Sequence, residues 1–292
     1  MVDTHCHLNF KVFKNDYREV ISRSFKNGIK ELIIVGSNYE TSKRAIEIAK
    51  KFKNCYVSPG LHPIHVYPVK SPKGRGISPK AKLFNRVEEE EFDKQEYIPL
   101  IRANSRMVKA IGETGFDYTV FVPAKAGLQK RVSAEVGDEG GQKGKIIELQ
   151  KQIFLKHLEL AKEFNLPVIL HCRGEASNPF RAYQDLLREI KRFASGPPSS
   201  VNRRTSADTQ FSNFAYAQRK LAGVLHCFSG NWQIAQKFLD LGFYIGFTGI
   251  VTYKNCGQDL LEVIEKTPLE KVLIDLTPIS SKSLRFTPYL LT

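Results

Sequence analysis

The stretch ELIIVGSNYETSKRAIEIAKKFKNCYVSPGL (residues 31–61) decides the fold class, because it contains a strand, a helix and a second strand in succession. Its two ends, ELIIVG (31–36) and CYVSPGL (55–61), are short apolar runs typical of buried parallel strands. Between them, Asn38 is a suitable N-cap for a helix over residues 39–52. Two parallel strands joined by a helix are the unit from which α/β proteins are built.

The same alternation runs along the rest of the chain. Further apolar runs predict strands at residues 1–4, 108–113, 167–171, 223–227, 243–248 and 271–275. Amphipathic stretches predict helices at residues 16–27, 145–164, 233–241 and 260–266. Eight strands alternating with helices, without a glycine-rich phosphate loop after the first strand, favour a (β/α)8 TIM barrel over an open doubly wound sheet. A length of 292 residues allows two ordinary domains, but the strand count predicts a single barrel domain over residues 1–292.

Three stretches interrupt this alternation. Residues 68–106, 119–144 and 195–220 are rich in glycine, proline, serine and charged residues, so we expect surface insertions or disordered loops there. The first of them contains the acidic run Glu88–Glu91, which is more typical of a solvated helix face than of a metal site.

The composition indicates which class of partner the protein binds and in which cellular compartment it is expected. The 44 Lys and Arg residues exceed the 30 Asp and Glu residues, and a net charge of +14 favours a nucleic-acid partner over a neutral one. A basic surface that serves only solubility is the alternative. The 5 cysteines form no C-x-x-C pair, which argues against disulfides and zinc fingers. Without a long apolar run or a signal peptide, we expect a soluble protein of the cytoplasm or nucleus, with no membrane partner.

Polar residues gather at the carboxyl ends of the predicted strands, where barrel enzymes build their active sites. Six of the 7 histidines lie there. The residues at these ends are His5, His7, His62, His65, Glu113, His171, His226 and Asp275. Among the histidines, His65 is expected to be a loop residue, and His157, inside a predicted helix, to be structural.

This set of residues has the chemistry of a two-metal site. Neutral imidazole suits zinc and manganese, and a carboxylate between two ions can bridge them. Two ions about 3.5–4 Å apart can stabilise both the attacking and the leaving oxygen of a phosphodiester. Asp3, below the first histidine pair, is expected to orient it. Cys6, Cys172 and Cys227 each follow a candidate histidine, and we interpret them as packing residues pointing away from the site.

With these residues placed, the chain resembles the TatD family of metal-dependent deoxyribonucleases, within the wider group of amidohydrolase-like barrels. The matching stretches are DTHCHL (3–8), GLHP (60–63), IGETGFDY (111–118), PVILHCR (167–173), HCFSG (226–230) and YIGFTGIVTYKN (244–255). They occur in this order over residues 1 to about 275, and the three expected insertions lie outside them.

The resemblance implies a barrel that hydrolyses DNA, often from the 3′ end, with two divalent ions (Mg, Mn or Zn). It implies that His5, His7 and Glu113 hold one ion, and that Glu113, His171 and His226 hold the other. It also implies that His62 contacts the substrate phosphate. Arg173 would supply a nearby positive charge.

The chain departs from the family pattern after the eighth strand, where the family carries an acidic-Thr-Asp-small-Pro motif. The stretch here is VLIDLTP (272–278), in which Asp275 takes the place of the first acid and Thr277 the place of the essential Asp. A threonine hydroxyl is no substitute for a carboxylate base. We therefore expect Asp275, if the loop shifts, to act as metal ligand and, with Glu113, as a catalytic residue. Few residues follow it and Pro288 interrupts them, so we expect an incomplete or altered C-terminal end without the eighth outer helix.

Three functions follow from these observations. The first is a metal-dependent deoxyribonuclease, expected to act as a 3′-5′ exonuclease. The second, an amide or ester hydrolase, is disfavoured because such barrels commonly carry a carboxylated lysine where Glu113 stands here. The third is a catalytically impaired nucleic-acid-binding protein, which Thr277 and the short C-terminal end favour.

Overall fold

Eight parallel strands form the centre of the molecule. A computed structural model describes residues 1–66, 92–119, 142–196, 221–253 and 256–275. The strands are β1 (Val2–Cys6), β2 (Glu31–Val35), β3 (Cys55–Ser58), β4 (Ile111–Asp117), β5 (Val168–Arg173), β6 (Gly223–Leu225), β7 (Tyr244–Phe247) and β8 (Val272–Ile274). Their order in the sheet is β3-β2-β1-β8-β7-β6-β5-β4. A parallel bridge between Val57 and Val108 joins the two ends of this order, so the sheet curls into a nearly closed barrel. The predicted TIM barrel is confirmed.

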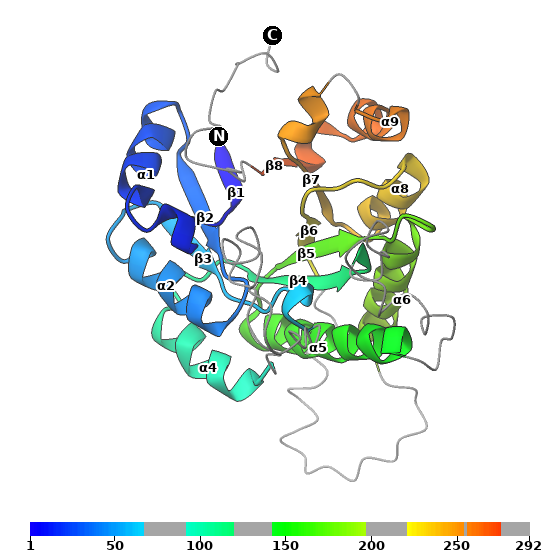
Figure 1. The fold of residues 1–292 in the computed structure, drawn as a ribbon, viewed down its shortest axis with the longest axis horizontal. Coiled ribbons are helices and arrows are strands. Elements are labelled where there is room, and N and C mark those ends of the chain that lie inside the picture. Colours follow the sequence, from blue (N-terminus) through cyan, green and yellow to red (C-terminus); the bar gives the residue numbers. More distant parts are fainter. Residues whose placement is uncertain (67–91, 120–141, 197–220, 254–255, 276–292) are drawn as a thin grey trace, which may run out of the picture.

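Helices cover the outside of this barrel (Figure 1). They are α1 (Tyr17–Lys26), α2 (Tyr39–Ala49), α4 (Lys94–Ala103), α5 (Gln142–Phe164), α6 (Arg181–Ser195), α8 (Trp232–Asp240) and α9 (Gln258–Lys266). Short 3-10 turns are η1 (Lys11–Phe13), η2 (Pro63–Val66), η4 (Gly249–Thr252) and η5 (Leu269–Lys271). Figure 1 shows α1, α2 and α4 beside β1 to β3, and α5, α6 and α8 beside β4 to β7. Among the described helices, none has the length and apolarity to cross a membrane.

Local signals in the sequence set where several of these helices begin. The side chain of Asn38 accepts a hydrogen bond from the amide of Thr41 at 2.8 Å and caps α2. The Thr41 hydroxyl in turn accepts from the Asn38 amide, which completes a capping box. Asn231 caps α8 in the same manner through the amide of Ile234. The predicted N-cap at Asn38 is confirmed.

Apolar side chains fill both faces of the strands. Inside the barrel, Val35, Ala110, Ile169 and Val224 are buried together, and Leu273 packs against them. Outward-facing residues of β1, β2 and β3 pack on α1 and α2, and those of β4 to β7 pack on α4, α5, α6 and α8. Each fully buried large side chain contributes roughly 1.5–3 kcal/mol. The sheet is therefore buried on both faces, as parallel sheets require.

The structure corrects two predicted boundaries. Residues 94–103, expected within an insertion, form α4, which supplies the crossover between β3 and β4. This helix was not predicted because the segment is charged and contains Pro99. Its buried face is formed by Tyr97 and Ile101. Strand β4 continues to Asp117, past the predicted end at residue 113, so Glu113 lies inside the strand. The ends of the other two expected insertions are helical, because α5 begins at Gln142 and α6 ends at Ser195. Residues 68–91, 120–141 and 197–220 of the expected insertions, which include the run 88–91, lie outside the described residues, as do residues 276–292 with Thr277 and Pro288.

Candidate metal centre

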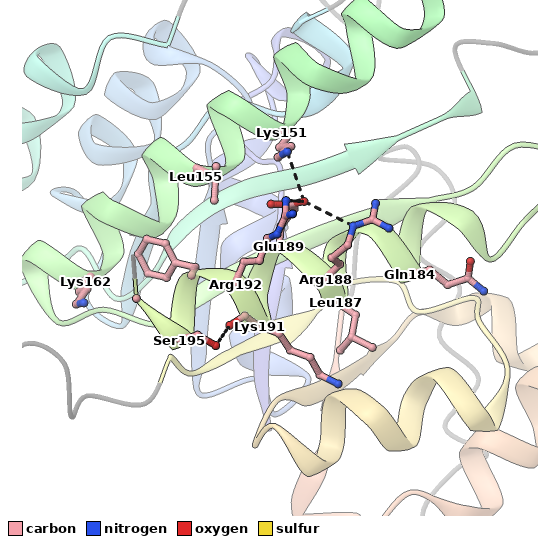
Figure 2. Close-up of a pocket in the computed structure, with 12 residues that line it drawn as sticks. Lys151, Leu155, Lys162, Gln184, Leu187, Arg188, Glu189, Lys191, Arg192 and Ser195 are labelled. Atoms are coloured by element: carbon pink, nitrogen blue, oxygen red, sulfur yellow. Dashed lines mark hydrogen bonds and ion pairs between the residues drawn. The ribbon is translucent and has the colours of Figure 1, made fainter. Parts of the chain in front are cut away.

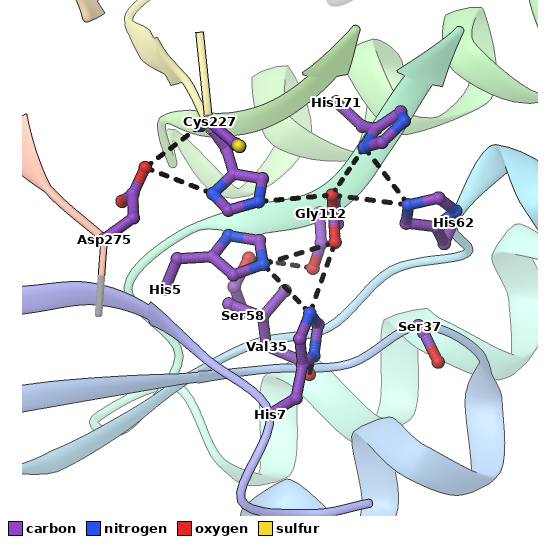
Figure 3. Close-up of polar contacts among 12 residues, drawn as sticks. His5, His7, Val35, Ser37, Ser58, His62, Gly112, His171, Cys227 and Asp275 are labelled. Atoms are coloured by element: carbon purple, nitrogen blue, oxygen red, sulfur yellow. Dashed lines mark hydrogen bonds and ion pairs between the residues drawn. The ribbon is translucent and has the colours of Figure 1, made fainter. Parts of the chain in front are cut away.

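One buried carboxylate, that of Glu113, lies at the centre of a cluster of histidines. Figure 3 shows four of these histidines, His5, His7, His62 and His171, around a common centre. Glu113 is 2% exposed and comes from β4. Its neighbours come from β1 and the residue after it, from the segment after β3, from β5 and from the residue after β6. They are His5, His7, His62, His171 and His226. The structure therefore brings five predicted site residues together around a sixth, Glu113.

Two histidines of the first motif face one oxygen of Glu113. The Oε2 atom lies 3.3 Å from Nε2 of His5 and 3.6 Å from Nε2 of His7. Nδ1 of His7 lies 3.0 Å from the carbonyl oxygen of Val35, which can only accept a hydrogen bond. His7 therefore donates through Nδ1 and keeps the Nε2 lone pair for the cluster. Burial, reinforced by His226, lowers the pKa of His5 to about 3, so His5 is also neutral and able to bind a cation.

His171 lies between two carboxylates on the other side of Glu113. Its Nδ1 is 2.9 Å from Oε1 of Glu113, and its Nε2 is 3.0 Å from Oδ2 of Asp117. Burial alone would lower the pKa of His171, but the hydrogen bonds to Asp117 and Glu113 outweigh it and raise this pKa to about 9. Burial raises the pKa of Glu113, yet the surrounding histidines hold it well below the usual value. Glu113 is therefore ionised near neutral pH.

His62 occupies a different position from the other histidines because its hydrogen bonds fix its tautomer. Nε2 of His62 lies 3.4 Å from Oε1 of Glu113 and 3.2 Å from Nδ1 of His171. The amide of Ile64 donates to Nδ1 of His62 at 3.0 Å. A neutral ring that accepts at Nδ1 carries its proton on Nε2. His62 therefore presents an N–H donor to the cluster, which agrees with the predicted substrate contact better than with a metal ligand.

Asp275 reaches the cluster through His226. Nε2 of His226 lies 3.9 Å from Oε1 of Glu113, and Nδ1 lies 3.1 Å from Oδ2 of Asp275. The carboxylate also accepts hydrogen bonds from the Thr4 hydroxyl at 2.8 Å and from the Cys227 amide at 3.1 Å. Asp275 is 1% exposed. It thus lies beside the cluster, where the sequence placed it, with its polar contacts already made.

Arg173 ends β5 at the same end of the barrel and is exposed. In the register of the sheet it pairs with Asp117 of β4. Burial raises the pKa of the Cys227 thiol, and the positive charge of Arg173 opposes that rise. Its predicted role as a phosphate-side cation stays a prediction.

The remaining histidines and two cysteines have structural contacts. His157 in α5 accepts from the Leu61 amide at 3.0 Å through Nε2, and its Nδ1 lies 2.8 Å from the carbonyl oxygen of Ile153. His65 is buried in η2. Cys6 and Cys172 are buried, and burial raises the pKa of both thiols well above the usual value. His157, Cys6 and Cys172 are therefore buried packing residues, as the sequence suggested, whereas His65, expected in a loop, is buried in a 3-10 turn.

Two residues of the site escaped the sequence analysis. Asp117 contacts His171 directly, and Thr4 contacts Asp275. A signal for Asp117 was present, because residues 113 and 117 share one face of a strand with a period of two. Asp3 does orient the first motif, but through the main chain: its Oδ1 accepts from the His5 amide at 3.0 Å.

A groove outside the barrel, between α5 and α6, contains a different kind of polar group (Figure 2). Glu189 is buried there and lies 3.6 Å from Lys151, 3.8 Å from Arg188 and 3.5 Å from Arg192. Its charge is balanced by these cations. None of the residues that line the groove belongs to the histidine cluster.

The donor atoms of the cluster fit divalent cations. Among the described residues, two triplets have ligand atoms within 4.8 Å of one another: His5, Glu113 and His226, and His62, Glu113 and His171. Both share the Glu113 carboxylate, whose two oxygens face different histidines. Imidazole nitrogens combined with one carboxylate suit zinc, manganese and similar ions.

Comparison with known proteins identifies the family. The model of the family described as TatD related DNase matches residues 2–277. The chain belongs to this family. Among TatD relatives, an uncharacterised metal-dependent hydrolase of Bacillus subtilis, YabD, is 25% identical over 275 residues, covering 94% of this chain and 78% of its own. The 3′-5′ ssDNA/RNA exonuclease TatD of Salmonella typhimurium is 24% identical over 281 residues, covering 94% and 77%.

Solved TatD structures share the fold. The crystal structure of YjjV, a TatD homologue of Escherichia coli K12, matches with a TM-score of 0.62 at 23% identity and covers 94% of this chain and 78% of that one. A TatD family hydrolase from Entamoeba histolytica matches with a TM-score of 0.57 at 22% identity, covering 95% and 73%. The chain is a metal-dependent hydrolase of the TatD family, as the sequence motifs indicated.

Proposed function

We propose that this TatD protein is a deoxyribonuclease that uses two divalent ions to hydrolyse phosphodiester bonds, removing nucleotides from the 3′ end of DNA. The observation that carries the proposal is the Glu113 carboxylate, whose Oε1 and Oε2 atoms face different histidines. The activity named for the Salmonella relative and the net charge of +14 support a nucleic-acid substrate.

The proposed ligand sets are those that the family resemblance implies, and the two oxygens of Glu113 face the histidines of each set separately. His5 and His7, with Oε2 of Glu113, would hold one ion. Oε1 of Glu113, with His171 and His226, would hold the second. His62 is left out because its Nε2 carries the proton when Ile64 donates to Nδ1. Two ions at such a site, whether Mg, Mn or Zn, supply a nucleophile from water at neutral pH and neutralise charge on the phosphodiester.

The chain's own residues would bind and orient the substrate around this centre. His62 presents its Nε2–H next to Glu113, where it can donate to a phosphate oxygen. Arg173, exposed at the end of β5, adds a positive charge for a neighbouring phosphate. Glu113 is a poor proton acceptor because its pKa lies well below the usual value, despite the rise that burial alone would cause. Its role is to hold charge at the centre of the site.

The proposal is tested by comparing substrates with one preparation of metal-loaded protein. Single-stranded DNA labelled at the 5′ end, nitrophenyl esters and anilides are each incubated with Mg, Mn and Zn. We expect shortening of DNA from the 3′ end and little turnover of esters or anilides. Glu113→Gln should abolish DNA cleavage, whereas Asp93→Asn, which keeps an N-cap on α4, should not. Faster turnover of an ester or anilide than of DNA would contradict the proposal.

A catalytically impaired nucleic-acid-binding protein is the second candidate. It is favoured by Asp275, whose carboxylate accepts three hydrogen bonds from Thr4, His226 and Cys227, and whose pKa, despite burial, is lowered by His226. A carboxylate of low pKa is an inefficient base near neutral pH. Salt-sensitive DNA binding without cleavage under any of the three metals would select this candidate.

A further inference from the structure

We propose that Asp117 and Asp275 are positioning residues for His171 and His226, respectively. Each carboxylate accepts a hydrogen bond from the ring nitrogen that points away from Glu113, and the other nitrogen of the ring is left facing Glu113. The inference rests on the proposed metal centre and adds to it. It gives Asp275 a different role from the metal ligand and base expected from the sequence. It also gives Asp117 a role that its place in the motif IGETGFDY did not reveal.

The contact between Asp117 and His171 is fixed from several directions. Oδ2 of Asp117 lies 3.0 Å from Nε2 of His171, and Oδ1 accepts from the amide and hydroxyl of Thr119 at 2.9 and 2.5 Å. The side chain of Gln150 in α5 bonds to both the amide and the carbonyl of Asp117, each at 3.1 Å. Asp117 is 3% exposed. The Asp117 carboxylate therefore has little freedom to move away from the His171 ring.

Close approach of β4 and β5 makes this contact possible. Gly115 of β4 is paired with His171 of β5, and its φ of +139° is one that side chains rarely adopt. A Cβ atom on Gly115 would lie 2.1 Å from the carbonyl oxygen of His171. The glycine thus lets the two strands meet where Asp117 reaches His171.

The contact between Asp275 and His226 is fixed in a comparable way. Oδ2 accepts from Nδ1 of His226 and from the Cys227 amide, both at 3.1 Å, and Oδ1 accepts from the Thr4 hydroxyl at 2.8 Å. A Cβ atom on Gly246 would lie 2.3 Å from Oδ2 of Asp275. Residues from β1, from β7 and from the segment after β6 therefore enclose the carboxylate.

The chemistry of these pairs determines which ring nitrogen carries a proton. An ionised carboxylate can only accept a hydrogen bond, so it favours an N–H on the ring nitrogen that faces it. Without an ion, His171 lies between Asp117 and Glu113, and the two carboxylates favour a proton on both of its nitrogens. A ring that binds an ion keeps only one proton. Asp117 and Asp275 would keep it on Nε2 of His171 and on Nδ1 of His226, which leaves the nitrogens that face Oε1 of Glu113 for the ion. A carboxylate behind a ligating histidine orients the ring and raises its basicity, and losing one typically weakens metal affinity 10–100-fold. Two such pairs would orient both histidines of one proposed ion site.

The first measurement needs no variant. In zinc-loaded protein with ¹⁵N-labelled histidine, long-range ¹H–¹⁵N spectra report which ring nitrogen of each histidine is protonated. We expect protons on Nε2 of His171 and Nδ1 of His226. A proton on Nε2 of His226, or on Nδ1 of His171, would overturn the proposal.

The second measurement compares Asp117→Asn and Asp275→Asn with the matched control Asp93→Asn, which replaces a carboxylate at the start of α4. Zinc affinity is measured by competition with a chromophoric chelator, and stoichiometry at saturating zinc. We expect each site variant to lose 10–100-fold in affinity with unchanged stoichiometry, and the control to match the unsubstituted protein. Unchanged affinity in the site variants would overturn the proposal. So would the loss of one zinc from Asp275→Asn at saturation, because it would make Asp275 a ligand.

Both measurements are made without nucleic acid, so they separate this proposal from the proposed nuclease activity. Protein that binds zinc with the expected tautomers but leaves DNA intact would contradict only the nuclease. Protein that cleaves DNA but keeps full zinc affinity in both variants would contradict only the positioning roles.

Discussion

The same side chain, histidine, has three different roles in this molecule, and its hydrogen-bond partners decide which. His7 donates to a main-chain carbonyl through one nitrogen and keeps the other for the cluster. His62 accepts from a main-chain amide and therefore donates toward Glu113. His157 uses both nitrogens for main-chain contacts, with the amide of Leu61 and the carbonyl of Ile153. Distance to Glu113 alone would not separate the first two.

His157 predicts a pH dependence of stability that is independent of the metal centre. Burial lowers its pKa from 6.5 to about 4 in the folded protein. Between these pH values the unfolded chain binds more protons at this histidine than the folded chain does. The contribution of His157 to stability therefore falls as the pH decreases. Glutamine does not titrate. We therefore expect the difference in unfolding free energy between the unsubstituted protein and His157→Gln to be about 2 kcal/mol smaller at pH 5 than at pH 7. Urea unfolding in the presence of a chelator measures this difference. An equal difference at both pH values would contradict the lowered pKa.

For individual residues, the sequence predicted the proposed metal ligands better than the residues that hydrogen-bond to those ligands. His5 and His7 were found because alternation along a strand places residues two apart on one face. His171 and His226 were found because each directly follows or ends an apolar run. The contacts of Asp117 and Asp275 depend on neighbouring strands, and on where the glycines let those strands approach. Spacing along one segment contains no such information.

At the scale of elements, β7 supports the site without contributing a ligand. Gly246 of β7 packs against the carboxylate that holds His226. We expect Gly246→Ala to cost about 1–3 kcal/mol of unfolding free energy, because the new methyl group overpacks a filled space. It should also weaken zinc binding by about tenfold or more through Asp275. Denaturant unfolding and chelator competition measure the two effects.

Gly249 supplies the matched control for this substitution. It lies three residues further along, and a Cβ atom there would have nothing within 4 Å. Gly249→Ala should therefore leave both stability and zinc affinity close to those of the unsubstituted protein. Equal effects of the two substitutions would show that β7 does not act through Asp275.

Most elements could be predicted from the sequence, since β2, α2 and β3 carry clear apolar periodicity and a capping residue. No helix range was predicted for α6 (Arg181–Ser195), and α4 was expected to lie within an insertion. The inner face of α4 is carried by few residues, among them Tyr97 and Ile101, and its burial depends on packing against α5 rather than on local preference. A short helix inside a charged segment is recognisable only once its partner is in place.

At the scale of the whole molecule, the proposed centre connects strands from both ends of the chain. β1 and β8 pair through Asp3 and Ile274, and His5 stacks on His226 with ring centroids 3.4 Å apart. An ion bound there would bind the folded chain and not the unfolded one. We expect saturating zinc, at about 100 times its dissociation constant, to add about 2.7 kcal/mol per independent site to the free energy of unfolding. Glu113→Gln should lose most of this gain, and a gain of the same size in that variant would place the zinc elsewhere.

The net charge of +14 gives a second prediction for the whole molecule. Single-stranded DNA bound to the Glu113→Gln variant should dissociate as salt is raised, because each phosphate neutralised by the protein releases counterions. The logarithm of the association constant should fall with the logarithm of salt concentration, with a slope of about −0.7 for each phosphate contacted. Fluorescence anisotropy at several salt concentrations measures this slope. Binding that does not change with salt would assign the positive charge to solubility alone.

The most direct test of the proposed metal-dependent deoxyribonuclease is the rate at which metal-stripped protein hydrolyses single-stranded DNA as Mn²⁺ is added back. We expect no hydrolysis in the presence of a chelator and recovery of hydrolysis with added Mn²⁺. Glu113→Gln should hydrolyse DNA more than about 100-fold more slowly under the same conditions. Removing a residue that only contacts a metal ligand costs at most about 100-fold, so a larger loss is expected for Glu113 itself. Hydrolysis that is independent of metal, that persists at full rate in Glu113→Gln, or that is absent at every Mn²⁺ concentration would contradict the proposal.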